Sequence, residues 1–185
     1  MSPAAVLRRI TALLDHAGIA YMLTGSFASA HYGAPRSTLD IDIVIAANPE
    51  QLRKFVQSLP GDTYYADLEA GMQAHHRQSM FNVIDLSDGW KIDLIIRKTR
   101  AFSHEEFNRR QVVNVQGLPL FVASPEDVII AKLEWSKLSE SKRQIEDVAA
   151  ILRARRESLD QIYLKKWIRE LDLEKEWSDA QTAAM

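Results

Sequence analysis

Two carboxylates stand one residue apart in an apolar segment of the chain, residues 39–45 (Leu-Asp-Ile-Asp-Ile-Val-Ile). Side chains alternate along a β-strand, so Asp40 and Asp42 are expected on one face and Ile41 on the other. Two acids on one face repel each other unless a cation joins them. Mg²⁺ is the expected cation, with Mn²⁺ as its substitute, because Mg²⁺ binds one or two carboxylates together with substrate phosphates.

A third carboxylate is expected from a neighbouring strand, because phosphoryl transfer by two metal ions needs acids that hold the ions about 3.5–4 Å apart. Asp93 lies in the apolar segment 91–96, where a lone buried charge would cost free energy. Asp85 lies on the other arm of the same predicted hairpin, closer to its turn, where a solvated acid needs no special role. The sequence favours Asp93, with Asp85 as the competing candidate.

A glycine-serine pair, Gly25-Ser26, follows the apolar segment 19–23 and is expected to bind phosphate. Glycine lets the backbone approach a ligand closely, and free amides at the start of a following helix favour an anion. The Ser26 hydroxyl adds a donor, and it is also a plausible helix cap. Arg36 precedes Asp40 in the same loop, where it is placed to reach a phosphate or to brace the loop.

The apolar pattern also predicts the elements that would position these side chains. Strands are expected over residues 19–23 and 40–45, and hairpins over 80–96 and 111–122. From Ser124-Pro125, a typical helix start, the chain is expected to be helical to about Trp177.

The predicted fold class is therefore α+β. A mixed β-sheet flanked by helices is expected in residues 1–122, and a C-terminal helical part in residues 123–185 is expected to pack on it.

The amino-acid composition excludes several kinds of site and of partner. The chain has 185 residues, a formal net charge of −2 and no cysteine, so disulfides, thiolate zinc sites and a cysteine nucleophile are excluded. The near-neutral charge gives no whole-protein attraction to nucleic acid or membrane. Without a signal peptide or a long apolar run, a cytoplasmic location with no membrane partner is expected.

Gly25-Ser26, the pair Asp40 and Asp42, and Asp93 together resemble the signature of the nucleotidyltransferase superfamily related to DNA polymerase beta. Residues 31–42, which read His-Tyr-Gly-Ala-Pro-Arg-Ser-Thr-Leu-Asp-Ile-Asp, are also similar to bacterial AbiEii-type and related uncharacterised nucleotidyltransferase-like proteins. Those chains often read HG-x-x-R-x-T-x-D-I-D.

The resemblance extends to the helical part, where such proteins carry a lysine on one helix and an acidic-apolar pair on the next. Lys132 and Asp147-Val148 match those positions. The plainer interpretation of Lys132 is a solvated helix lysine or a partner for Asp147.

The resemblance implies a fold, an activity and a set of site residues. Asp40, Asp42 and Asp93 would bind Mg²⁺, Gly25 and Ser26 would hold a nucleoside triphosphate, and Lys132 would approach its phosphates. The implied reaction moves a nucleoside monophosphate to a hydroxyl of RNA, protein or a small molecule and releases pyrophosphate.

Two other functions remain open from the sequence. One is a non-catalytic module that binds a nucleotide or a partner protein, as an antitoxin in a toxin–antitoxin pair would. The other is a phosphate-ester hydrolase that uses the same acids.

Overall fold

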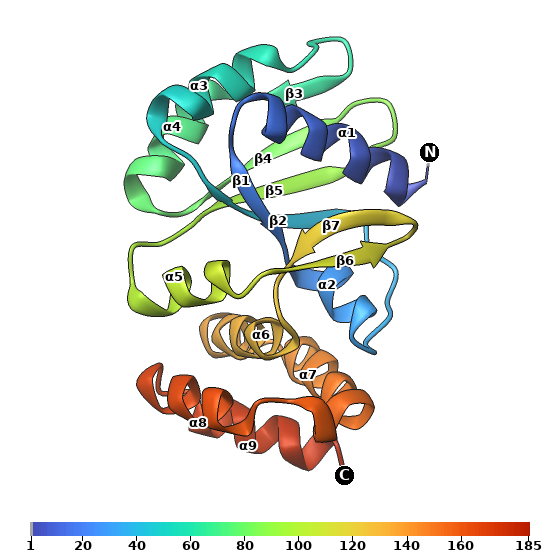
Figure 1. The fold of residues 1–185 in the computed structure, drawn as a ribbon, viewed down its shortest axis with the longest axis vertical. Helices are drawn as coiled ribbons and strands as arrows, with labels where there is room; N and C mark the ends of the chain where they lie inside the picture. The colour runs from blue at the N-terminus through green and yellow to red at the C-terminus, as the bar shows by residue number, and fades with distance from the viewer. Residues whose placement is uncertain (1) are drawn as a thin grey trace. The chain divides into compact units, whose positions relative to one another are not determined.

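Seven strands form one mixed sheet in the computed structural model, which describes residues 2–185. The strand order is β3-β4-β5-β2-β1-β7-β6 (Figure 1). The strands are β1 (Ala20–Leu23), β2 (Asp40–Ala46), β3 (Tyr64–Ala66), β4 (Met80–Asp85), β5 (Lys91–Ile96), β6 (Gln111–Val115) and β7 (Leu118–Val122). Two neighbouring pairs are parallel, β2 with β5 and β1 with β7, and the other pairs are antiparallel. The predicted α+β class and both predicted hairpins are confirmed.

The chain divides into two compact units, a sheet unit and a helical unit. The sheet unit holds the chain up to Thr24 together with Thr38–Val122. Its helices are α1 (Pro3–His16), α3 (Pro49–Ser58), α4 (Leu68–Arg77) and α5 (Ala101–Asn108). Helix α1 packs on β1 and α3, and α3 packs on α4 (Figure 1).

The two faces of the central strands differ in character. On β2, Ile41, Ile43 and Ile45 are fully buried, and on β5 the alternate residues Ile92, Leu94 and Ile96 are buried as well. Each such side chain stabilises the fold by about 1.5–3 kcal/mol through its removal from water. The other face of the same strands carries the polar residues 40 and 42 on β2 and 91 and 93 on β5. This alternation fixes which side of the sheet can do chemistry.

The helical unit holds Gly25–Ser37 and Ala123–Met185. Its elements are α2 (Gly25–His31), α6 (Pro125–Ser139), α7 (Lys142–Arg155), the 3-10 helix η1 (Arg156–Ser158), α8 (Gln161–Glu170) and α9 (Glu174–Ala183). The predicted helix start is present, because the Ser124 hydroxyl accepts a hydrogen bond from the Asp127 amide at 3.3 Å and Pro125 follows it. The predicted division into residues 1–122 and 123–185 stays a prediction.

Helix α2 lies before residue 122 in the sequence but groups with the helical unit. It packs on α6 and α7. Just after it, the Tyr32 hydroxyl donates a 2.8 Å hydrogen bond to the Ala123 carbonyl. Gly33 has φ +112°, and a Cβ there would lie 2.5 Å from that of Ala154, so glycine lets this loop approach α7 closely. Tertiary packing therefore overrides the position of α2 in the sequence.

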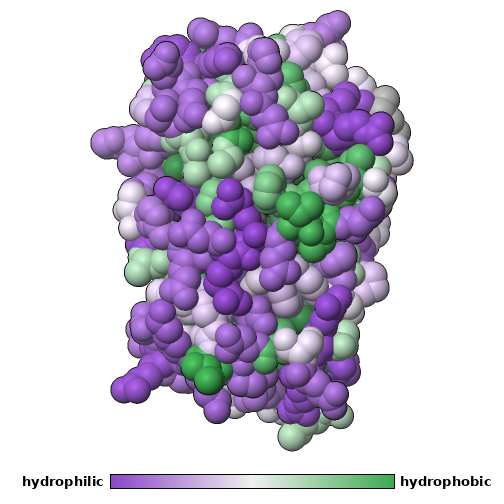
Figure 2. All heavy atoms as spheres, viewed as in Figure 1, coloured by the Kyte–Doolittle hydropathy of each residue, from purple (hydrophilic) through white to green (hydrophobic). Residues whose placement is uncertain are grey.

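The face shown in Figure 2 is mostly hydrophilic, and an apolar patch lies over the β6–β7 hairpin. Val112 and Phe121 pair across this hairpin and are both exposed. Among residues 2–185, no helix combines the length and the apolar character that crossing a bilayer requires. The cytoplasmic location stays a prediction.

Candidate active site

Asp42 and Asp93 lie directly opposite each other on the parallel strands β2 and β5. Paired residues on neighbouring strands project to the same face, so both carboxylates share the face that also carries Asp40. Asp93 is 5% exposed, Asp42 is half-buried and Asp40 is exposed. The structure therefore brings the three predicted acids to one face of two adjacent strands.

Polar residues continue this row across the sheet. The Thr24 amide, just past the end of β1, donates a 2.9 Å hydrogen bond to the Asp42 carbonyl. On the other side, Asn82 of β4 is opposite Asp93, and its amide nitrogen donates to Asp93 Oδ1. This bond holds one carboxylate oxygen of Asp93 in place, so the orientation of that buried acid is set by the sheet itself.

A cation already lies among the acids. Lys91 of β5 is opposite Asp40, and its Nζ is 3.4 Å from Asp40 Oδ1 and 3.0 Å from Asp93 Oδ2. The hydrogen bond to Asp93 raises the pKa of the Lys91 amine above its ordinary value. The ammonium therefore offsets the charge of the buried carboxylate, which would otherwise be costly to desolvate.

The donor set fits a hard divalent cation in its chemistry, because carboxylate oxygens are the ligands that Mg²⁺ prefers. The Lys91 ammonium, held between Asp40 and Asp93, shows that this face accepts positive charge. As the side chains stand in residues 2–185, no group of three or more His, Cys, Asp or Glu is arranged to hold a metal ion. The metal-binding role of Asp40, Asp42 and Asp93 stays a prediction.

Asp85, the competing candidate for the third acid, lies on the opposite face of the sheet. It is fully buried and lies on the same face of β4 as the core residues Phe81 and Val83. Arg9 of α1 donates to its Oδ2 at 2.5 Å, and the Ser87 amide donates to its Oδ1 at 3.0 Å. Asp85 thus joins α1 to the sheet and cannot share a ligand with Asp42.

The predicted phosphate-binding residues belong to the helical unit. Gly25 has φ +60°, a left-handed conformation that favours glycine, and Ser26 is buried on the seven-residue helix α2. Arg36 donates from Nη2 to the Ser26 hydroxyl. Its Nε is buried without a hydrogen bond and lies 3.6 Å from Asp147 Oδ2. Arg36 therefore braces the loop, and its phosphate role stays a prediction.

Lys132 forms the pair with Asp147 that the plainer interpretation expected. Its side chain is 4% exposed, and its Nζ lies 2.7 Å from Asp147 Oδ2 and 3.0 Å from Gln144 Oε1. These contacts join α6 to α7. A contact between Lys132 and phosphate also stays a prediction.

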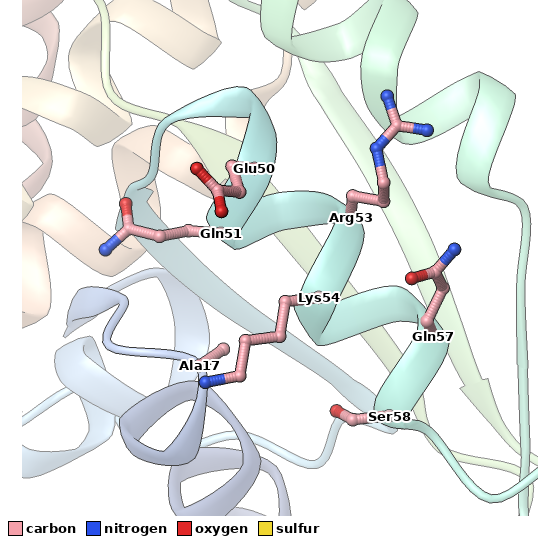
Figure 3. A pocket seen from close by; sticks show the side chains of 7 residues that line it. All are labelled: Ala17, Glu50, Gln51, Arg53, Lys54, Gln57 and Ser58. Atoms are coloured by element: carbon pink, nitrogen blue, oxygen red, sulfur yellow. The ribbon is translucent and has the colours of Figure 1, made fainter.

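An open hollow of about 620 Å³ lies on α3, away from the acids (Figure 3). Helix α3 follows the end of β2 opposite to Asp40. Lys54 extends toward Ala17 and donates to the His16 carbonyl at 3.1 Å, and Gln51 donates to the Gly18 carbonyl at 2.6 Å. These side chains tie α3 to the end of α1, so the hollow is not the candidate active site.

Sequence reasoning missed Lys91 and Asn82. Asn82 has no local signal, because only the pairing of β4 with β5 places it beside Asp93. Lys91 stands two residues before Asp93, so the alternation of one strand puts both on the same face. That signal was available in the sequence.

Several solved structures share the fold of this chain. The solution structure of the antibiotic-resistance factor ANT(2'')-Ia is similar with a TM-score of 0.58 and 12% identity, over 98% of this chain and 97% of that chain. A nucleotidyltransferase-like protein from Paracoccidioides brasiliensis has a TM-score of 0.55 and 18% identity, over 98% and 92%. A putative nucleotidyltransferase from H. pylori has a TM-score of 0.52 and 17% identity, over 99% of this chain and 84% of that chain.

No curated protein matches the chain by sequence. A family model described as a nucleotidyltransferase of unknown function, DUF6036, matches residues 5–183. This match confirms the predicted superfamily, while the likeness to AbiEii-type proteins stays a prediction. The chain belongs to this family of nucleotidyltransferases.

Proposed function

We propose that this nucleotidyltransferase moves a nucleoside monophosphate from a nucleoside triphosphate to a hydroxyl acceptor in a reaction that depends on Mg²⁺. The observation that carries the proposal is the register of Asp42 with Asp93, which puts a buried acid beside the Asp40–Asp42 pair. In the reaction the acceptor oxygen bonds to the α-phosphorus, pyrophosphate leaves and the hydroxyl proton passes to solvent.

The three acids would hold the divalent cation, which when bound offsets charge that develops on the phosphates and lowers the pKa of the acceptor hydroxyl. Asn82 would keep Asp93 oriented for this task, since it already fixes one oxygen of that carboxylate. Gly25, Ser26 and Arg36 would bind the phosphates. The Arg36 guanidinium, which now lies 3.6 Å from Asp147, is a group that pairs readily with phosphate.

The acceptor is open among small molecules, RNA and protein. ANT(2'')-Ia has been crystallised with adenylyl-2''-tobramycin, and that structure has a TM-score of 0.50 and 13% identity to this chain. Aminoglycosides therefore belong in an acceptor panel, alongside RNA and protein from cells.

The test is transfer of label from each of the four α-labelled triphosphates, with Mg²⁺ or Mn²⁺, to this panel. Asp42→Asn is expected to lower labelling by about a hundredfold or more, because a neutral amide neither offsets the charge of a metal ion nor retains it. Asp62→Asn is the matched control, because Asp62 is an exposed acid in a turn. Equal labelling by both variants would place the chemistry elsewhere.

A second candidate is a module that binds a nucleotide or a partner protein without turnover. The position of Lys91 favours it, because a resident ammonium supplies the acids with a cation of their own. A role as antitoxin in a toxin–antitoxin pair belongs to this candidate. Nucleotide binding by calorimetry, with no transfer to any acceptor in the panel, would favour it over the enzyme.

A further inference from the structure

Lys91 is the one residue of the row on β2 and β5 whose charge is positive. Its ammonium bridges an exposed carboxylate and a buried one, since the side chain of Asp40 is 54% exposed and that of Asp93 is 7% exposed. A lysine that only solubilised the surface would extend into water. This one instead lies within 3.4 Å of Asp40 Oδ1 and 3.0 Å of Asp93 Oδ2.

We infer that Lys91 is a built-in counter-ion that competes with the divalent cation for Asp40 and Asp93, so that metal binding displaces the Lys91 ammonium. The inference rests on the proposed function, because it takes these acids as the metal ligands. It assigns Lys91 a regulatory role in metal binding and no contact with the substrate.

The surroundings of Lys91 allow this exchange. Its side chain is 41% exposed and is carried on a flexible four-carbon stem, so the ammonium can move into solvent at little cost. Asp93 stays in position when the ammonium leaves, because Asn82 holds its other oxygen. The exchange therefore needs no rearrangement of the sheet.

Two consequences follow for the metal-free protein. The acids remain neutralised in part, so the sheet unit tolerates a buried Asp93 without metal. A divalent cation must also replace an existing ion pair, so its apparent affinity is lower than the carboxylates alone would give.

The first experiment measures Mn²⁺ binding to the full chain by electron paramagnetic resonance, without nucleotide. Lys91→Met is expected to tighten Mn²⁺ binding by about three- to fivefold, the worth of one partly exposed ion pair. Lys98→Met is the matched control, because Lys98 is exposed just past the end of β5 and has the same charge. It should change the dissociation constant by less than about twofold.

The second experiment uses the wild-type chain, so it does not depend on how a variant folds. The rate at which each lysine amine is acetylated is followed by mass spectrometry with and without Mn²⁺. Lys91 is expected to react faster once Mn²⁺ is bound, since displacement exposes its amine, while Lys98 keeps its rate.

The outcomes separate the inference from the proposed function. If Asp42→Asn loses Mn²⁺ but Lys91→Met binds it no more tightly than the wild type, the metal site stands and the counter-ion role is wrong. Slower acetylation of Lys91 with Mn²⁺, or equal tightening by both lysine variants, would also overturn the counter-ion role. If neither the wild type nor Lys91→Met binds Mn²⁺, both proposals fail.

Discussion

The two units treat ionised side chains in different ways. In the sheet unit one ammonium, Lys91, is shared by Asp40 and Asp93, and its side chain is 41% exposed. In the helical unit Asp147 Oδ2 lies 2.7 Å from the Lys132 ammonium and 3.6 Å from Arg36 Nε, and Lys132 is almost completely buried. The comparison indicates that an ion pair with an exposed cation, such as that of Lys91, can exchange its cation. An ion pair with a buried cation, such as that of Lys132, is structural.

A buried pair that loses one partner leaves a charge without water, whereas an exposed cation is replaced by solvent or by another ion. We therefore expect the buried Lys132–Asp147 pair of the helical unit to determine stability, and the exposed Lys91 bridge of the sheet unit to affect ligand binding. Three predictions test this contrast, in order of decreasing effect.

The largest effect is expected at the buried pair that joins α6 to α7. Lys132→Met should lower the free energy of unfolding by about 3–5 kcal/mol. The buried Asp147 carboxylate would lose its 2.7 Å contact with the ammonium and keep the 3.6 Å contact with Arg36. Urea denaturation followed by circular dichroism measures this loss. The double variant Lys132→Met with Asp147→Leu should recover part of this loss of stability.

Lys91→Met is the comparison and should lower the free energy of unfolding by about 1 kcal/mol or less. Equal losses of stability at the two lysines would contradict the expected difference between the two units.

A smaller effect is expected at Asp85, which shares a hairpin with Asp93 but faces the core. Asp85→Asn should cost about 2 kcal/mol, because it weakens a charge-assisted bond to Arg9 in a fully buried position. Transfer of label per folded molecule should be unchanged, while Asp93→Asn should lose transfer. Loss of transfer in the folded Asp85→Asn protein would reassign the third acid.

The smallest effect is expected at Tyr32, a buried neutral group of the helical unit. Tyr32→Phe should cost about 1 kcal/mol at neutral pH through the lost hydrogen bond to the Ala123 carbonyl. Burial raises the pKa of Tyr32 from 10.0 to about 12, so the folded state favours the neutral phenol. Its contribution is complete below pH 10.0 and is lost as the pH rises toward about 12.

Urea unfolding between about pH 8 and 11 should therefore show a smaller fall in stability for Tyr32→Phe than for the wild type. Tyr65→Phe is the control, because Tyr65 is 61% exposed. Parallel curves for Tyr32→Phe and wild type would show that Tyr32 does not titrate in this range.

Much of the candidate site follows from local pattern. Alternation along one strand places Asp40 with Asp42, and the apolar surroundings of Asp93 single it out from Asp85. In the structure Asp85 turns to the core and Asp93 lies on the same face as the pair, while the metal-binding role of these acids stays a prediction.

The pairing between strands is not encoded in the local sequence, so the remaining contacts of the site could not be predicted from it. The parallel register of β2 with β5 joins segments about fifty residues apart, so Asn82 and the bridge from Lys91 to Asp40 emerge only from the assembled sheet. The grouping of α2 with α6 and α7 likewise depends on packing and on the bond from Tyr32 to Ala123.

The helical unit is formed by two separate segments of the chain, Gly25–Ser37 and Ala123–Met185, and this affects the design of truncated versions of the protein. A fragment that stops after Val122 would keep α2 but lose α6 and α7, its packing partners. The apolar surface of Phe27 and Ala28 would then be left uncovered, which promotes aggregation during expression. Screens of shortened versions should therefore remove Gly25–Ser37 as well, with a short glycine-rich bridge from Thr24 to Thr38.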